Sequence, residues 1–79
     1  MIYQVIYTKQ GAGYNLYDKI NIEEENTNIN DIAWIINRKA NLQYTDLKLI
    51  KGNLNKMIFG TIMDGIIFDT PILIIQKII

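Results

Sequence analysis

Side chains that could perform chemistry are scarce in this sequence. Its 79 residues include no histidine, no cysteine and no serine, which excludes an imidazole base, a Ser–His or Cys–His nucleophile, and a zinc site made of cysteine and histidine. Eight carboxylates remain, and a pair of them could hold Mg²⁺ or cleave a glycosidic bond. Their spacing does not indicate such a pair, and the acidic run at residues 23–25 is typical of a solvated loop. We therefore predict no enzymatic activity, no metal and no cofactor.

Two glycines, Gly11 and Gly13, give residues 9–13 a faint likeness to a phosphate-binding loop. A P-loop also needs a Lys-Thr or Lys-Ser pair and a helix directly after it, and neither is found there. Glycine equally supplies the positive φ angles of a turn. We interpret this segment as a turn between two strands.

The charge balance disfavours nucleic acid as a partner. Eight basic and eight acidic residues give a net charge of zero, whereas binding to a phosphate backbone depends on a positive field. Arg38 is the single arginine, and the lysines are scattered along the sequence. We therefore expect a protein partner before a nucleic acid.

Composition also bears on location. No apolar run approaches the ~20 residues that span a bilayer, and the first residues lack the basic segment of a signal peptide. With no cysteine, these features predict a cytoplasmic protein that does not contact a membrane. The sequence contains eighteen isoleucines and nine asparagines, amino acids whose codons are AT-rich. This bias indicates that the gene comes from a low-GC bacterium, its phage or another AT-rich virus. For a viral protein the expected location is the host cytosol.

The elements begin with a hairpin. β-branched and aromatic residues predict a strand over residues 1–8, and alternating apolar and polar residues predict a second over residues 14–22. Asp18 breaks this alternation because it shares a face with Leu16 and Ile20. We expect either a bulge at Asp18 or a position at the edge of the sheet.

A helix follows at residues 28–40. Ile29, Ile32, Ala33, Ile36 and Ala40 recur at helical spacing and form one apolar stripe. Thr27 or Asn28 can cap its start, Asp31 suits its first turn, and Arg38 and Lys39 suit its last. Asn41 is expected to end it.

The remaining chain is rich in strand signals. We predict strands at residues 44–51 and 56–63 with a turn at 51–53, and an Asp64-Gly65 hairpin turn before residues 66–68. Pro71 is expected to interrupt the run at a strand start or edge, followed by a last strand at residues 72–79. The predicted order is ββαβββ. It forms a single α+β domain over residues 1–79, in which one mixed or antiparallel sheet of about five strands packs on one helix.

This arrangement resembles the ubiquitin-like β-grasp. The likeness rests on the opening strand, the glycine-bearing hairpin, the helix, the Leu47-to-Gly52 strand and turn, and the apolar final strand. The chain ends in Lys77-Ile78-Ile79 without the diglycine tail of a conjugated modifier. The resemblance therefore implies a fold and does not imply conjugation.

Trp34 is the first candidate for a partner-binding residue. It points about 140° away from the centre of the apolar helix stripe, with Ile35 on the flank and Arg38 on the same helix. Tryptophan is enriched in binding hot spots. The alternative is a core residue covered by a loop or by the chain end.

Three tyrosines form the second candidate surface. Tyr3 and Tyr7 share a strand face, and Tyr17 lies on the polar face of the neighbouring strand. On an open sheet face they would suit a protein partner, or stack on bases. Ordinary cross-strand pairing is the alternative.

Isoleucine-rich C-terminal strands provide the third signal. Residues 66–68 and 72–75 are apolar on both strand faces, and one helix covers only one of them. We therefore predict a homodimer or a complex with another protein.

The expected function is a small protein-binding module, for which the size and codon bias suggest a phage- or mobile-element-encoded inhibitor of a host or defence protein. The alternatives are a structural subunit that oligomerises through its sheet, and a nucleic-acid-binding protein.

Overall fold

The computed structural model describes residues 1–8, 17–25, 28–63 and 65–79, and for residues 62, 63 and 66–70 it describes the backbone alone. The elements follow the order ββαβββ that the sequence predicts. They are β1 (Ile2–Thr8), β2 (Tyr17–Glu23), α1 (Ile29–Lys39), β3 (Leu47–Asn53), β4 (Lys56–Met63) and β5 (Ile66–Lys77). The protein is thus an α+β structure with one sheet, as expected from the sequence.

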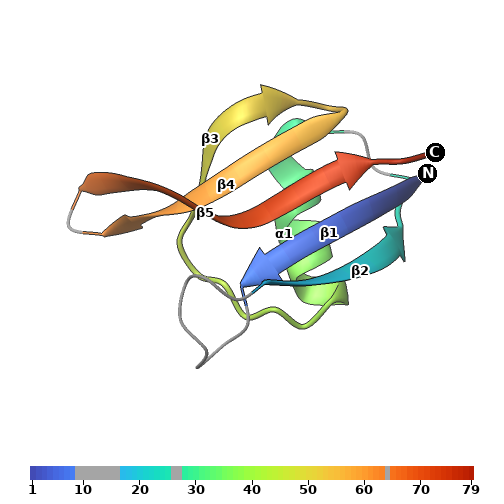
Figure 1. Cartoon of the computed structure of the whole chain (residues 1–79), viewed down its shortest axis with the longest axis horizontal. Helices are drawn as coiled ribbons and strands as arrows, with labels where there is room; N and C mark the ends of the chain where they lie inside the picture. Colours follow the sequence, from blue (N-terminus) through green and yellow to red (C-terminus); the bar gives the residue numbers. More distant parts are fainter. Residues whose placement is uncertain (9–16, 26–27, 64) are drawn as a thin grey trace.

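All five strands form one sheet in the order β2-β1-β5-β4-β3, and every neighbouring pair is antiparallel. Because β2 and β3 lie at opposite edges, the chain between them has to cross the whole sheet. Helix α1 makes that crossing on one side, and Figure 1 shows it behind the strands. The sheet therefore has a face covered by α1 and a second face, called the open face below, over which no described helix lies.

Alternate residues of each strand point to these two faces. The core lies between the sheet and α1, and its residues from β1 and β5 include Val5 and Ile75, both fully buried. The complete set of buried hydrophobic residues is Tyr3, Val5, Ile32, Ala33, Ile36, Met57, Phe59, Ile72, Leu73 and Ile75. Three of them, Ile32, Ala33 and Ile36, come from the predicted helix stripe, which confirms its orientation.

Both ends of α1 follow the sequence signals. Asn28 is the N-cap, and its side-chain Oδ1 accepts a hydrogen bond from the Asn30 backbone N–H at 2.9 Å; Thr27 lies outside the described residues. At the other end Asn41 adopts a left-handed φ of 55°. Its N–H donates to the Arg38 carbonyl, and the Leu42 N–H donates to the Asn37 carbonyl. This is a Schellman ending with asparagine in the position usually taken by glycine.

Strand β5 corrects the prediction for Pro71. The strand continues from Ile66 to Lys77 and lies in the centre of the sheet, although the sequence suggested a break. Pairing with β1 ends at Leu73, and the β4 register jumps from Leu73 to Phe68. Pro71 lies inside this irregularity, where the ladder does not need the N–H that proline lacks.

Strand β3 begins and ends later than predicted. Residues 51–53 belong to the strand, and the turn lies at residues 54–55. Tyr44 is outside the strand because the Asn37 side chain binds its backbone, donating to the Tyr44 carbonyl at 2.8 Å and accepting from its N–H at 3.0 Å. The loop before β3 is thus attached to α1.

The two hairpin predictions have different outcomes. Met63 pairs with Ile66, and Gly65 has a φ of 76°, as a two-residue turn at 64–65 requires; Asp64 itself lies outside the described residues. Strands β1 and β2 pair as predicted, but the glycine turn at residues 9–13 lies outside them too. Asp18 is an exposed residue of edge strand β2 in unbroken register with Tyr7, so of the two alternatives the edge position is correct.

Candidate protein-binding surfaces

The tyrosines do not form the predicted platform. Tyr3 is only 1% exposed and belongs to the core beneath α1. Tyr7 lies on the same face and packs against the core. Tyr17 pairs with Thr8 and so lies on the opposite face, with 42% of its surface exposed. The reason is the strand alternation: Tyr3 and Tyr7 share the face of Val5, which α1 covers.

A row of isoleucines crosses the open face instead. Ile6 pairs with Ile74, and Ile74 pairs with Ile58, so the three side chains are direct cross-strand neighbours on β1, β5 and β4. Each is partly exposed, whereas the neighbouring core residues Val5 and Ile75 are fully buried. No described segment covers this row to the extent that α1 covers the other face. We call Ile6, Ile58 and Ile74 the isoleucine row.

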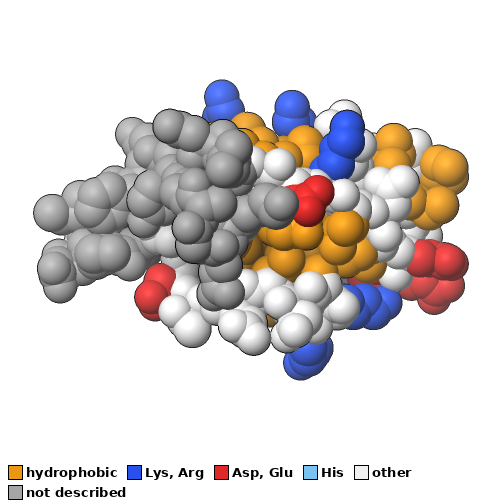
Figure 2. All heavy atoms as spheres, turned by 60° about the horizontal axis from the view of Figure 1, so that its bottom comes forward, with side chains coloured by type: hydrophobic (Ala, Val, Ile, Leu, Met, Phe, Trp, Pro, Cys, Tyr) orange, Lys and Arg blue, Asp and Glu red, His pale blue; other side chains and the backbone are white. Residues whose placement is uncertain are grey.

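Lysines border the isoleucine row. Lys19 pairs with Ile6 at one end of the row, and Lys51 pairs with Ile58 at the other. The four exposed lysines that the strand register places on the open face are Lys19, Lys48, Lys51 and Lys56. In Figure 2 the open face is seen obliquely along the upper margin, where basic side chains stand beside hydrophobic ones. Positions scattered in the sequence are therefore gathered on one face.

A β-bulge contributes to this gathering. Lys48 and Lys51 are three residues apart and would point to opposite faces of a regular strand. The register of β3 shifts between Leu49 and Lys51. Lys48 consequently pairs with Gly60 and Lys51 with Ile58, both on the open face. A shallow depression of about 230 Å³ lies beside the isoleucine row, and it is lined by Lys19, Gln4, Ile20 and Asn21.

The helix carries a separate exposed surface. Trp34 is 43% exposed, so no described loop or chain end buries it. Ile35 beside it is half-buried, and Arg38 is exposed on the same helix. These three residues lie on α1, which is on the other side of the sheet from the isoleucine row. The structure therefore does not bring the candidate residues together: Trp34, Ile35 and Arg38 form one group, and Tyr17 alone remains on the open face.

Two tyrosine hydroxyls hold the irregular part of β5. The Tyr17 hydroxyl donates to the Pro71 carbonyl at 2.7 Å, which takes the side chain across β1. The Tyr44 hydroxyl lies 2.8 Å from Thr8 Oγ1 and 3.0 Å from the Ile72 carbonyl, and it accepts from the Thr8 N–H at 3.2 Å. Tyr44 thus joins β1, β5 and the loop after α1.

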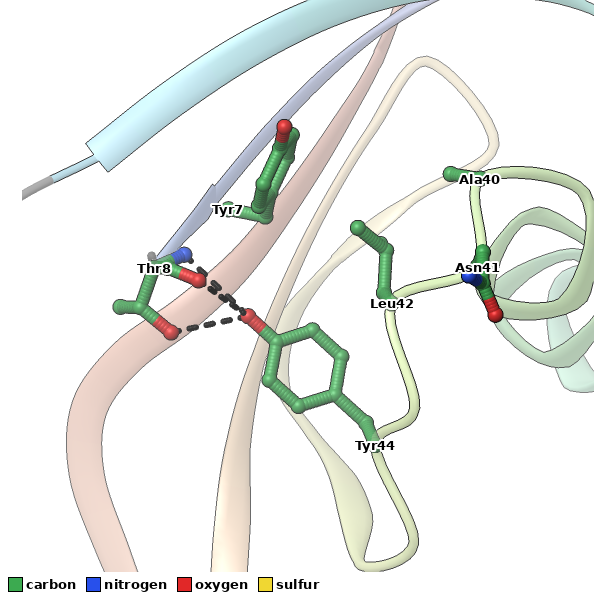
Figure 3. Close-up of a pocket in the computed structure, with 6 residues that line it drawn as sticks. All are labelled: Tyr7, Thr8, Ala40, Asn41, Leu42 and Tyr44. Carbon is green, nitrogen blue, oxygen red and sulfur yellow. Dashed lines mark hydrogen bonds between the residues drawn. The ribbon is translucent and has the colours of Figure 1, made fainter. Parts of the chain in front are cut away.

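A pocket of about 170 Å³ opens beside Tyr44. Figure 3 shows its walls, which come from the end of β1 and the loop after α1. They consist of Tyr7, Thr8, Ala40, Asn41, Leu42 and Tyr44. No carboxylate or amine lines it, so it offers hydroxyls and an amide but no charged acid or base for catalysis.

Neither the described residues nor comparisons with known proteins indicate a specific activity. Within the described ranges, no group of three or more acidic residues could hold a metal ion, and α1 is too short to cross a membrane. No protein-family model matches the chain, and neither the curated proteins nor the solved structures include a match. The resemblance to the β-grasp is therefore not confirmed by any fold match.

Proposed function

We propose that this protein is a non-enzymatic binding module that holds another protein on the open face of its sheet. The observation that carries the proposal is the isoleucine row, because three aligned aliphatic side chains lie on central strands without a described cover. Apolar side chains surrounded by polar ones are typical of the centre of a protein interface. The small size and the abundance of isoleucine and asparagine, whose codons are AT-rich, favour an inhibitor, encoded by a phage or mobile element, that occupies a surface of a host or defence protein.

The Trp34 surface is the second candidate place for a partner. A large exposed aromatic side chain on a helix can anchor an interface. It is a single residue beside a half-buried Ile35, whereas the open face offers a row across three strands. The experiment below therefore compares the two surfaces directly.

The test uses tagged protein recovered from a low-GC host and partner proteins quantified by mass spectrometry. The open-face variant is Ile58→Thr with Ile74→Thr, which retains β-branched side chains and so favours the strand conformation. Trp34→Ala is the comparison on α1. We expect the open-face variant to lose about 2 kcal/mol of binding free energy, roughly a 30-fold weaker affinity, while Trp34→Ala changes it little.

Circular dichroism must show that both variants keep the fold. A partner lost with Trp34→Ala but retained by the open-face variant would mean that binding uses the helix, and the proposed surface would be wrong. Equal recovery by wild type and both variants would exclude both surfaces.

A further inference from the structure

We infer that the open face binds an acidic amphipathic segment of a different protein, with apolar side chains over the isoleucine row and carboxylates beside the lysines. The inference rests on the proposed function, and it specifies the chemistry of the partner. It depends on how charge is distributed between the two sides of the molecule.

The net charge of zero conceals a separation of charge. Among the side chains that the structure describes, the open face carries four lysines, Lys19, Lys48, Lys51 and Lys56, and one exposed carboxylate, Glu23, which pairs with Ile2 at a corner. The other described carboxylates lie elsewhere: Asp18 on the side of α1, Glu24 and Glu25 after β2, Asp31 in α1, and Asp46 before β3. The described part of the open face therefore has a net positive charge, which favours a negatively charged partner.

The lysines are also placed to act together with the apolar row. Lys19 and Lys51 are cross-strand neighbours of its first and last isoleucines. A segment laid along the row could bury its apolar side chains at the centre and pair carboxylates at both ends. Lysine stems are long and apolar, so they can extend the covered area while the ammonium groups stay hydrated.

A second copy of this chain is a poor fit to the same face. In a two-fold dimer the same patch meets itself. Two open faces would then bring lysines against lysines, and like charges across an interface cost affinity. The separation of charge thus favours a different protein over the homodimer that the sequence left open.

Single-stranded nucleic acid fits the apolar centre poorly. Sheets that bind it stack bases on aromatic rings, but Tyr3 and Tyr7 face α1 and the centre of the open face is aliphatic. Tyr17 lies at the side of the face with its hydroxyl bonded to Pro71. The lysines could still attract phosphates, so an oligonucleotide belongs in the test.

The experiment is a titration followed by isoleucine-methyl NMR. The main probe is a synthetic helical peptide of about 18 residues, five turns, with leucines at helical spacing and glutamates elsewhere. A second peptide replaces every glutamate with lysine, and a third probe is a thymidine oligonucleotide of about 20 nucleotides. We expect the acidic peptide to shift the methyl signals of Ile6, Ile58 and Ile74, and its binding to weaken about tenfold between ~50 and ~300 mM salt.

Matched charge reversals locate the effect. Lys51→Glu and Arg38→Glu change the net charge equally, but Lys51 lies on the open face and Arg38 lies on α1. We expect Lys51→Glu to weaken binding of the acidic peptide about tenfold and Arg38→Glu less than about twofold. Equal effects of the two reversals would show a nonspecific charge attraction and would overturn the inference.

The other outcomes separate this inference from the proposed function. Tighter binding of the oligonucleotide than of the acidic peptide, at the same methyls, would make nucleic acid the ligand. Methyl shifts that depend on protein concentration alone would make a second copy the occupant. If no probe moves these methyls, while Ile58→Thr with Ile74→Thr still loses a captured partner, the proposed function stands and the acidic chemistry is wrong.

Discussion

Replacing Tyr44 with phenylalanine should lower the free energy of unfolding by more than the loss of a single hydrogen bond would. The hydroxyl accepts a hydrogen bond from the Thr8 N–H at 3.2 Å, lies 2.8 Å from Thr8 Oγ1, and lies within donating distance of the Ile72 carbonyl at 3.0 Å. A phenol can donate one hydrogen bond and accept two, so this arrangement uses its full capacity. These contacts are partly buried and long-range, joining the loop after α1 to β1 and β5. The Thr8 carbonyl, 3.3 Å from the hydroxyl, competes for the same proton.

The expected cost follows from these three bonds. Each contributes about 0.5–1.5 kcal/mol net, and partial access of water to the partners reduces the sum. We expect a loss of about 2 kcal/mol in the free energy of unfolding. A domain of this size loses about 4–8 °C of melting temperature per kcal/mol, so the midpoint should fall by about 8–16 °C.

The assays are urea denaturation for the free energy and thermal unfolding for the melting temperature, both followed by circular dichroism, with Tyr7→Phe as the matched control. Tyr7 is also a half-buried pocket residue, but its hydroxyl has no hydrogen bond to the described residues. We expect Tyr7→Phe to change stability by less than about 0.5 kcal/mol. If the two variants lose equal stability, the hydroxyl of Tyr44 does not join the strands as argued.

Three backbone positions give further predictions. A Cβ at Gly52, where φ is +130°, would collide with the Lys56 carbonyl oxygen, so Gly52→Ala should lower the free energy of unfolding by about 3 kcal/mol. At Gly65, where φ is +76°, a Cβ meets nothing within 4 Å. Gly65→Ala should therefore lower it by about 1 kcal/mol in the same denaturation assay. Equal costs would show that the collision is relieved by a small shift. At Asn41, whose φ is 55°, Asn41→Ala should lower the unfolding free energy by about 1 kcal/mol while Asn41→Gly leaves it unchanged or raises it; a stability loss with glycine would contradict the left-handed ending of α1.

The helix was the element most accessible from the sequence, because its signals are local. The apolar stripe, the cap at Asn28 and the stop at Asn41 each depend on residues within one or two turns. The 64–65 turn was predictable for the same reason. Helical geometry also placed Trp34 off the apolar stripe, but it left open whether a loop or the chain end covers the side chain, and only the structure shows it 43% exposed.

The errors arose where the outcome depended on pairing between distant strands. Pro71 was expected at a strand start or edge, but the register jump between β4 and β5 lets a central strand contain it. The face of Tyr3 could not be assigned, because alternation shows which residues share a face and not which face the helix covers. Tyr44 was predicted in a strand, and only the contact with Asn37 shows why it lies outside.

The isoleucine row and the lysines beside it show that the prediction of function was limited in the same way, because it also depends on how distant strands pair. In the sequence, Lys19 is far from Lys48 and Lys51, the latter two would point to opposite faces of a regular strand, and net neutrality argues against any strong field. The strand order brings β2 and β3 to opposite edges, and the β3 bulge turns Lys48 and Lys51 to one side. Net charge describes the sum over the molecule, whereas a partner meets one face of it. Salt dependence measured at that face, rather than the pI of the chain, is therefore the measurement that tests the proposed acidic partner.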